Sequence, residues 1–128
     1  IIEQLRSQYR PWAINALSLE AGKWLVERGQ TAIPDLPSYL TETRRLRLAL
    51  DKIDVIHTLE TQTNFFLCTI AGITARELKE YLAHEHGILI RDASNFTGLT
   101  PHHFRIATQS PAENDALVAA IRQFLENR

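Results

Sequence analysis

Two helix starts in the second half of this chain constrain its fold more than any other feature. Thr74 is followed three residues later by Glu77, and the two form a capping box, in which each side chain bonds the backbone N–H of the other. Ser110 and Glu113 repeat this spacing, and Pro111 follows Ser110 at the first helical position, where proline is favoured. The sequence therefore predicts helices that begin beside residues 74 and 110.

Short apolar segments alternate with these two helices. Gly87 can end the first of them in a left-handed conformation. The other segments are rich in β-branched and aromatic residues, which is typical of strands, and comprise residues 55–57, 64–70, 88–91 and 103–107. We therefore expect an α+β fold in which a small, mostly antiparallel sheet of three or four strands packs against helices.

The first half of the chain is expected to be helical. A helix opens at Pro11 and stops at Gly29, with an apolar face formed by Trp12, Ala16, Leu19, Trp24 and Leu25. Residues 30–37 contain two prolines and form a connection. A second helix covers residues 38–53, and its inward-facing positions recur at three- and four-residue steps: Leu36, Leu40, Thr43, Leu46, Leu50 and Ile53.

Composition places the chain among single-domain globular proteins. It has 128 residues, of which 45% are hydrophobic and 23% charged. A net charge of −1 argues against general nucleic-acid binding, which needs a basic excess or stripe. There is no apolar run of roughly 20 residues that could span a membrane, and no stretch with the apolar core and small-residue cleavage site that are typical of a signal peptide. We therefore expect neither nucleic acid nor membrane as a partner.

The numbers of cysteine and methionine residues indicate the cellular compartment of the protein and whether the chain is part of a longer one. The single cysteine, Cys68, has no internal disulfide partner and lies in an apolar segment, which indicates a reduced, cytoplasmic protein. The chain has no Met, and residues 1–5 read like the interior of a helix. We therefore expect it to be the C-terminal part of a longer protein.

Arg91 and Arg105 are the strongest candidates for binding a ligand. Arg91 ends one apolar segment and Arg105 lies inside the next, with a loop of small polar residues between them. A guanidinium grips a carboxylate or phosphate with two hydrogen bonds and never loses its charge. If the two segments are neighbouring strands, the pair forms a site for a doubly anionic small molecule. The alternative is that one or both are ordinary surface arginines.

Other chemistry has weaker support in the sequence. His84 and His86 are two residues apart on a predicted helix, so they do not face one another, and no zinc motif accompanies them. Cys68 is read as a buried packing residue rather than a nucleophile. The run at residues 44–47 contains three arginines and is read as the outer face of a helix, with nucleic-acid contact as a weak alternative. The sequence contains no glycine-rich phosphate loop.

Several motifs resemble one known family. Residues 87–99 read G-I-L-I-R-D-x-S-N-F-x-G-L, residues 104–107 read F-R-I-A, and residues 110–117 read S-P-x-E-N-D-x-L. Residues 11–17, P-W-x-x-N-A-L, and residues 63–66, T-N-F-F, add support. This pattern resembles the class I/II aminotransferases of fold type I, which use pyridoxal 5′-phosphate (PLP). The threonine-phosphate decarboxylases and histidinol-phosphate aminotransferases are the most similar subgroup.

The resemblance implies a role for each matching position. Residues 1–128 would be the small C-terminal domain, and PLP would be bound by a large N-terminal domain outside this chain. Arg105 would hold the substrate carboxylate and Arg91 a phosphate or second carboxylate, while Ser94 and Asn95 would shape the loop over the substrate. The whole enzyme would be a homodimer acting on an amino-acid substrate, in pathways such as histidine or cobalamin biosynthesis. The chain alone would be inactive.

Departures from the family pattern bear on these expectations. The only lysines are Lys23, Lys52 and Lys79, and none lies in the SxxK-like segment in which the family carries its Schiff-base lysine. Thr108 and Gln109 stand where more basic residues are expected. The substrate, and the choice between transamination and decarboxylation, stay open. A different class of function also stays open: a non-catalytic α+β module that binds a small anion or a protein partner.

Overall fold

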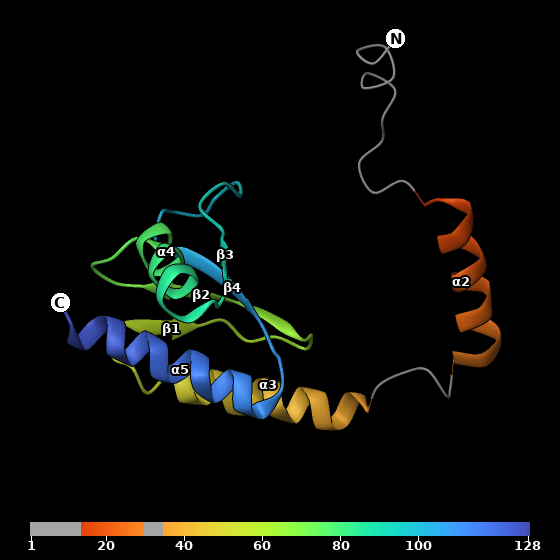
Figure 1. The fold of residues 1–128 in the computed structure, drawn as a ribbon, viewed down its shortest axis with the longest axis horizontal. Coiled ribbons are helices and arrows are strands. Elements are labelled where there is room, and N and C mark those ends of the chain that lie inside the picture. The colour runs from red at the N-terminus through yellow and green to blue at the C-terminus, as the bar shows by residue number, and fades with distance from the viewer. Residues whose placement is uncertain (1–13, 30–34) are drawn as a thin grey trace, which may run out of the picture. The chain divides into compact units, whose positions relative to one another are not determined.

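The computed structural model describes residues 14–29 and 35–128, which belong to two compact units divided after Pro34 (Figure 1). The described part of the first unit contains one helix, α2 (Ala16–Arg28). Asn15 caps it by accepting a 2.9 Å hydrogen bond from the backbone N–H of Ser18. The helix was predicted to open at Pro11, which lies outside the described residues, as does Trp12 of the predicted apolar face. None of the α2 residues is buried in the described structure, so the predicted apolar face is exposed there.

The second unit is built on a four-stranded antiparallel sheet. Its strands are β1 (Ile56–Thr58), β2 (Phe65–Ile70), β3 (Arg91–Asp92) and β4 (His103–Ala107), in the order β1-β2-β4-β3. This confirms the predicted fold class. One strand differs from its prediction, because residues 88–90 do not join the sheet and β3 contains only two residues.

Three helices cover one face of this sheet: α3 (Leu36–Leu50), α4 (Ala75–His86) and α5 (Pro111–Glu126) (Figure 1). In β4, the buried side chains Phe104 and Ile106 alternate with half-buried or exposed ones, so only one face of the strand meets the helices. These side chains share a core with Leu46 and Leu50 of α3, Leu78 and Leu82 of α4, and Leu117 and Ile121 of α5.

The predicted helix starts are confirmed in both cases. Thr74 and Glu77 form a complete capping box at α4, and Ser110 and Glu113 form another at α5. Gly87 ends α4 with φ of 66°, the left-handed conformation that favours glycine. The helix predicted at residues 38–53 begins and ends earlier than expected. It starts at Leu36, because Asp35 caps it, and ends at Leu50.

No helix of the unit that spans residues 35–128 covers the other face of the sheet, which we call the open face. The alternate residues of the strands place the following side chains there: His57, Phe65, Leu67, Thr69, Arg91, His103, Arg105 and Ala107. Both candidate arginines therefore lie on the face that the protein's own core does not use.

Candidate functional site

The two candidate arginines lie directly opposite each other on neighbouring strands. Arg91 of β3 and Arg105 of β4 are partners in the antiparallel register, and both side chains are exposed. Directly opposed residues on antiparallel strands have Cβ atoms about 4.5–5.5 Å apart and point to the same face. The structure thus brings together two residues that are fourteen positions apart in sequence, as the neighbouring-strand hypothesis required.

Aromatic rings support both guanidinium groups. The Arg105 Cζ atom lies 5.1 Å from the centroid of the Phe65 ring, and the Arg91 Cζ atom lies 5.8 Å from that of Phe96. A cation held over an aromatic face gains roughly 0.5–1 kcal/mol at an exposed site. The rings restrict where the two side chains can go and leave the guanidinium edges free for hydrogen bonds.

The pair lacks a neutralising carboxylate. Within residues 14–29 and 35–128, no ion pair involves Arg91 or Arg105. Asp92 adjoins Arg91 in sequence, but its Oδ1 accepts a 2.8 Å hydrogen bond from the backbone N–H of Ser94. That bond, with a smaller effect of the Ser94 side chain, lowers the pKa of Asp92. Like charges directly opposite on a sheet destabilise it, so this arrangement favours a bound anion.

The loop after β3 follows directly on this pair. Ser94 and Asn95 are exposed, and Ser94 helps to turn the chain through its bond to Asp92. Backbone bonds from Phe96 N–H to Ala93 and from Leu99 N–H to Phe96 continue the turn, each at 3.1 Å. Gly98 has φ of 86°, which most residues rarely adopt. These contacts are compatible with the loop-shaping role predicted for Ser94 and leave the role of Asn95 as a prediction.

His103 was not among the predicted site residues, although the sequence predicts a strand over residues 103–107. The structure confirms this strand and places His103 in β4, two residues before Arg105 and on the same face. The available signal was the alternation in residues 103–107, where a strand beginning at residue 103 necessarily orients positions 103 and 105 alike.

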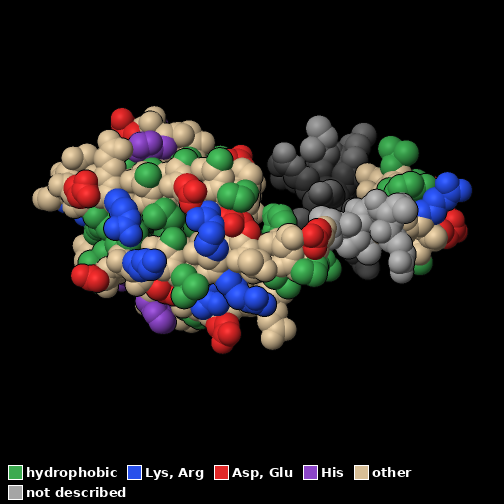
Figure 2. All heavy atoms as spheres, turned by 90° about the horizontal axis from the view of Figure 1, so that it is seen from below, with side chains coloured by type: hydrophobic (Ala, Val, Ile, Leu, Met, Phe, Trp, Pro, Cys, Tyr) green, Lys and Arg blue, Asp and Glu red, His purple; other side chains and the backbone are tan. Residues whose placement is uncertain are grey.

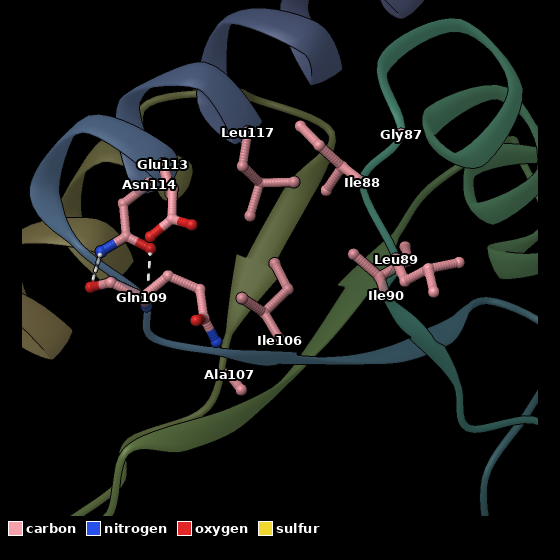
Figure 3. Close-up of a pocket in the computed structure, with 10 residues that line it drawn as sticks. All are labelled: Gly87, Ile88, Leu89, Ile90, Ile106, Ala107, Gln109, Glu113, Asn114 and Leu117. Carbon is pink, nitrogen blue, oxygen red and sulfur yellow. Dashed lines mark hydrogen bonds between the residues drawn. The ribbon is translucent and has the colours of Figure 1, made fainter.

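A separate pocket of about 280 Å³ lies between α5 and the segment at residues 87–90 (Figure 3). It exists because residues 88–90 run apart from β4 instead of extending β3. Ile88, Ile106 and Leu117 supply apolar walls. On the polar side, Asn114 donates to the Gln109 carbonyl and accepts from the Gln109 N–H, each at 3.0 Å. Neither candidate arginine lines this pocket.

Surface charges elsewhere are mixed in sign. Figure 2 shows basic side chains separated by apolar and acidic ones. Arg45, from the basic run at residues 44–47, bonds Glu42 at 2.8 Å and Asp115 at 2.7 Å. Leu46 of the same run is fully buried, as predicted for a helix with a basic outer face.

The remaining candidates occupy structural positions. Cys68 is buried in β2, and this burial raises the pKa of its thiol, so the prediction of a packing role is confirmed. His84 and His86 are exposed on α4. The residues that the structure describes include no cluster of three or more metal-ligating side chains. No described helix is long and apolar enough to cross a membrane.

None of the three lysines fits a Schiff base to PLP. Lys23 forms a 2.6 Å ion pair with Glu20, and Lys52 and Lys79 are exposed. A Schiff-base lysine needs a desolvated amine beside groups that hold the cofactor. These residues therefore do not supply the covalent attachment.

Known proteins match almost the whole chain. The family model for "Aminotransferase class I and II" matches residues 1–121. A protein named putative threonine-phosphate decarboxylase, from Caldanaerobacter subterraneus subsp. tengcongensis, is 34% identical over 98% of this chain and 34% of its own length. A histidinol-phosphate aminotransferase of Neisseria meningitidis is 29% identical over 96% of the chain and 33% of its own length.

Solved structures agree with the sequence relatives. The crystal structure of L-threonine-O-3-phosphate decarboxylase from Porphyromonas gingivalis is 36% identical, with a TM-score of 0.83 over 97% of this chain and 38% of that protein. This chain thus spans about a third of the length of the relatives that it matches. The chain belongs to the class I and II aminotransferase family, whose members are generally PLP-dependent, and its relatives are threonine-phosphate decarboxylases and histidinol-phosphate aminotransferases.

Proposed function

We propose that this chain is the substrate-binding C-terminal domain of a PLP-dependent aminotransferase or decarboxylase that acts on a phosphorylated amino acid or amine. The observation that carries the proposal is the cross-strand pair of Arg91 and Arg105, which has no ion-pair partner in the described structure. The names of the relatives supply the substrate class, since they include both a threonine-phosphate decarboxylase and a histidinol-phosphate aminotransferase.

Each arginine has its own task in this proposal. Arg105 holds the substrate carboxylate in a bidentate hydrogen-bonded pair, and Arg91 binds the phosphate or a second carboxylate. Ser94 and Asn95 shape the loop beside the bound substrate. The Phe65 and Phe96 rings restrain the guanidinium groups before binding, so that less side-chain entropy is lost when the substrate arrives.

The chemistry at the substrate Cα requires groups that this chain does not supply. PLP, when bound, provides the electron sink, and its lysine belongs to a segment outside residues 1–128. In this proposal the partners of the chain are the N-terminal domain of its own protein, a second copy in a homodimer, and the amino-acid substrate. The contribution of residues 1–128 is to orient the substrate, a task that transamination and decarboxylation share.

Replacement of each arginine by glutamine in the complete enzyme tests the proposal. The substrates are L-threonine O-3-phosphate and histidinol phosphate, each compared with its dephosphorylated form. Arg91→Gln should lower kcat/KM about 10- to 100-fold for the phosphorylated forms and much less for the others, since a hydrogen bond to a charged group contributes roughly 1.5–3 kcal/mol. Arg105→Gln should cost a similar factor for any substrate that carries a carboxylate.

Arg122→Gln is the matched control, because Arg122 is exposed on α5 and lies away from the open face. Unchanged kinetics in both Arg91 and Arg105 variants would refute the binding role. An equal loss for phosphorylated and dephosphorylated substrates in Arg91→Gln would refute its phosphate assignment. A complete protein that never binds PLP would favour a non-catalytic anion-binding module instead.

A further inference from the structure

We propose that His103 is a third hydrogen-bond donor of the arginine site and that it favours a phosphate over a carboxylate there. The inference rests on the proposed function, since it adds a group to the same site. Its basis is the position of His103 on the open face and the state of its imidazole, which the neighbouring turn determines.

The sheet register places His103 beside both arginines. His103 precedes Arg105 by two residues on β4, so their side chains share a face and their Cα atoms are about 6.5–7 Å apart. The backbone N–H of Ala93 donates to the His103 carbonyl at 3.0 Å, which continues the β3–β4 register beyond Arg91 and Arg105. His103 is therefore the diagonal neighbour of Arg91, at a separation that long side chains bridge.

Thr100 determines which ring nitrogen of His103 carries the hydrogen. Its backbone N–H donates to Nδ1 at 3.1 Å, and its hydroxyl oxygen lies 2.9 Å from the same nitrogen. A backbone N–H can only donate, so Nδ1 is an acceptor and the neutral ring carries its hydrogen on Nε2. Within the part of the chain that the structure describes, no hydrogen bond to Nε2 occurs. The ring therefore has an unused N–H donor.

The turn that orients His103 is itself attached to the core. The His103 N–H donates to the Thr100 carbonyl at 3.1 Å. The Ala75 N–H, at the start of α4, donates to the Pro101 carbonyl at 2.8 Å. His102 Nδ1 lies 2.6 Å from the Ile73 carbonyl oxygen. Because the turn is held at several points, the His103 ring is oriented before a ligand arrives, which lowers the entropic cost of binding.

The number of hydrogen-bond donors in the site determines whether it suits a carboxylate or a phosphate. A carboxylate has two oxygens, which one bidentate guanidinium satisfies, whereas the phosphate of a monoester has three terminal oxygens. A third donor next to the two arginines therefore contributes more to the binding of a phosphate than to that of a carboxylate. Neutral His103 adds this donor without adding a third positive charge to a pair that already repels itself.

Two amide substitutions in the complete enzyme test the role of His103. The Gln side chain is long enough to place an N–H donor close to the position of Nε2, whereas Asn reaches only as far as Nδ1. We expect His103→Asn to weaken competitive inhibition by inorganic phosphate about tenfold, and His103→Gln to stay within about threefold of the unmodified enzyme, as the loss and recovery of one charge-assisted bond predict. KM for L-threonine O-3-phosphate should change in parallel.

His84→Asn is the matched control, because His84 is exposed on α4, which packs against the opposite face of the sheet. Equal weakening in the two His103 variants, or none in either, would overturn the proposal for His103. If Arg105→Gln and Arg91→Gln weaken phosphate inhibition while His103→Asn does not, the proposed role of His103 is wrong and the proposed function stands. If none of these variants changes it, the proposed function fails as well.

Discussion

The two faces of the sheet are made by alternate residues of the same strands, yet they differ in burial and in charge. On β4, Phe104 and Ile106 lie in the core, while Arg105 between them is exposed beside a second arginine. The face that α3, α4 and α5 cover, here called the covered face, gains stability from apolar burial. The open face places like charges opposite each other, which reduces stability. Such a difference between the faces is expected where one of them supports the fold and the other binds a ligand.

The covered side also contains the buried polar groups that fix the end of β4. Thr108 is fully buried, and its hydroxyl lies 2.9 Å from that of Thr43 on α3. The Tyr39 hydroxyl donates to the Thr108 carbonyl at 2.7 Å. Since β4 carries Arg105, these bonds hold the strand that presents the site. Contacts on the covered face thus hold β4 in place and so position Arg105 on the open face.

Adjacent substitutions on β4 give the largest expected contrast between the faces. Phe104→Ala should reduce the free energy of unfolding by about 3–5 kcal/mol, because it leaves a cavity in the core. Arg105→Ala, one residue away, should change it by less than about 0.5 kcal/mol, because the loss of the contact with the Phe65 ring is offset by relief of the repulsion from Arg91. Urea unfolding of the chain measures both. Similar losses at the two positions would show that the open face also contributes to folding.

Acid should weaken the start of α4, at the Thr74–Glu77 capping box. Hydrogen bonds from the Thr74 N–H and hydroxyl, followed by the contact with Arg128, lower the pKa of Glu77 from 4.5 to about 2. A carboxyl group whose pKa is lower in the folded state contributes stability above its unfolded pKa and loses it as pH falls through the folded value. Stability should therefore decline from about pH 4.5 to 2.

The Glu77→Gln variant checks this pH dependence. Gln is also accepted at position N3 of a capping box, because its amide oxygen can still accept from the Thr74 N–H, so the helix start is preserved, but Gln cannot titrate. Its thermal midpoint should fall less steeply than that of the unmodified chain over the same acid range. Identical slopes would show that Glu77 has no part in acid unfolding.

The smallest expected effect comes from the charges of the open face. Arg91→Gln removes the like-charge opposition with Arg105, a gain of about 0.2–1 kcal/mol at low salt, but it also loses the contact with the Phe96 ring, which offsets part of that gain. The gain should shrink as salt screens the repulsion, whose range is about 10 Å at 0.1 M. Urea unfolding at low and high salt measures it. A variant less stable than the original would mean that Arg91 serves the fold rather than a ligand.

Local signals in the sequence were sufficient for most of the covered side. Both capping boxes, the left-handed Gly87 and the buried position of Cys68 depend on neighbouring residues or on apolar pattern, and the structure confirms them. The strand expected at residues 88–91 was only partly right, because pairing with β4 depends on distant packing.

The sequence alone determined the kinds of chemical group that the site contains, since two arginines near short strands indicate anion binding wherever they lie. Only the tertiary structure decided that Arg91 and Arg105 are direct cross-strand partners and that His103 shares their face. The physical reason is that helix caps are formed by residues three or four positions apart, whereas a sheet register joins residues far apart in sequence. A shift of one residue in that register would turn a side chain from the open face to the core.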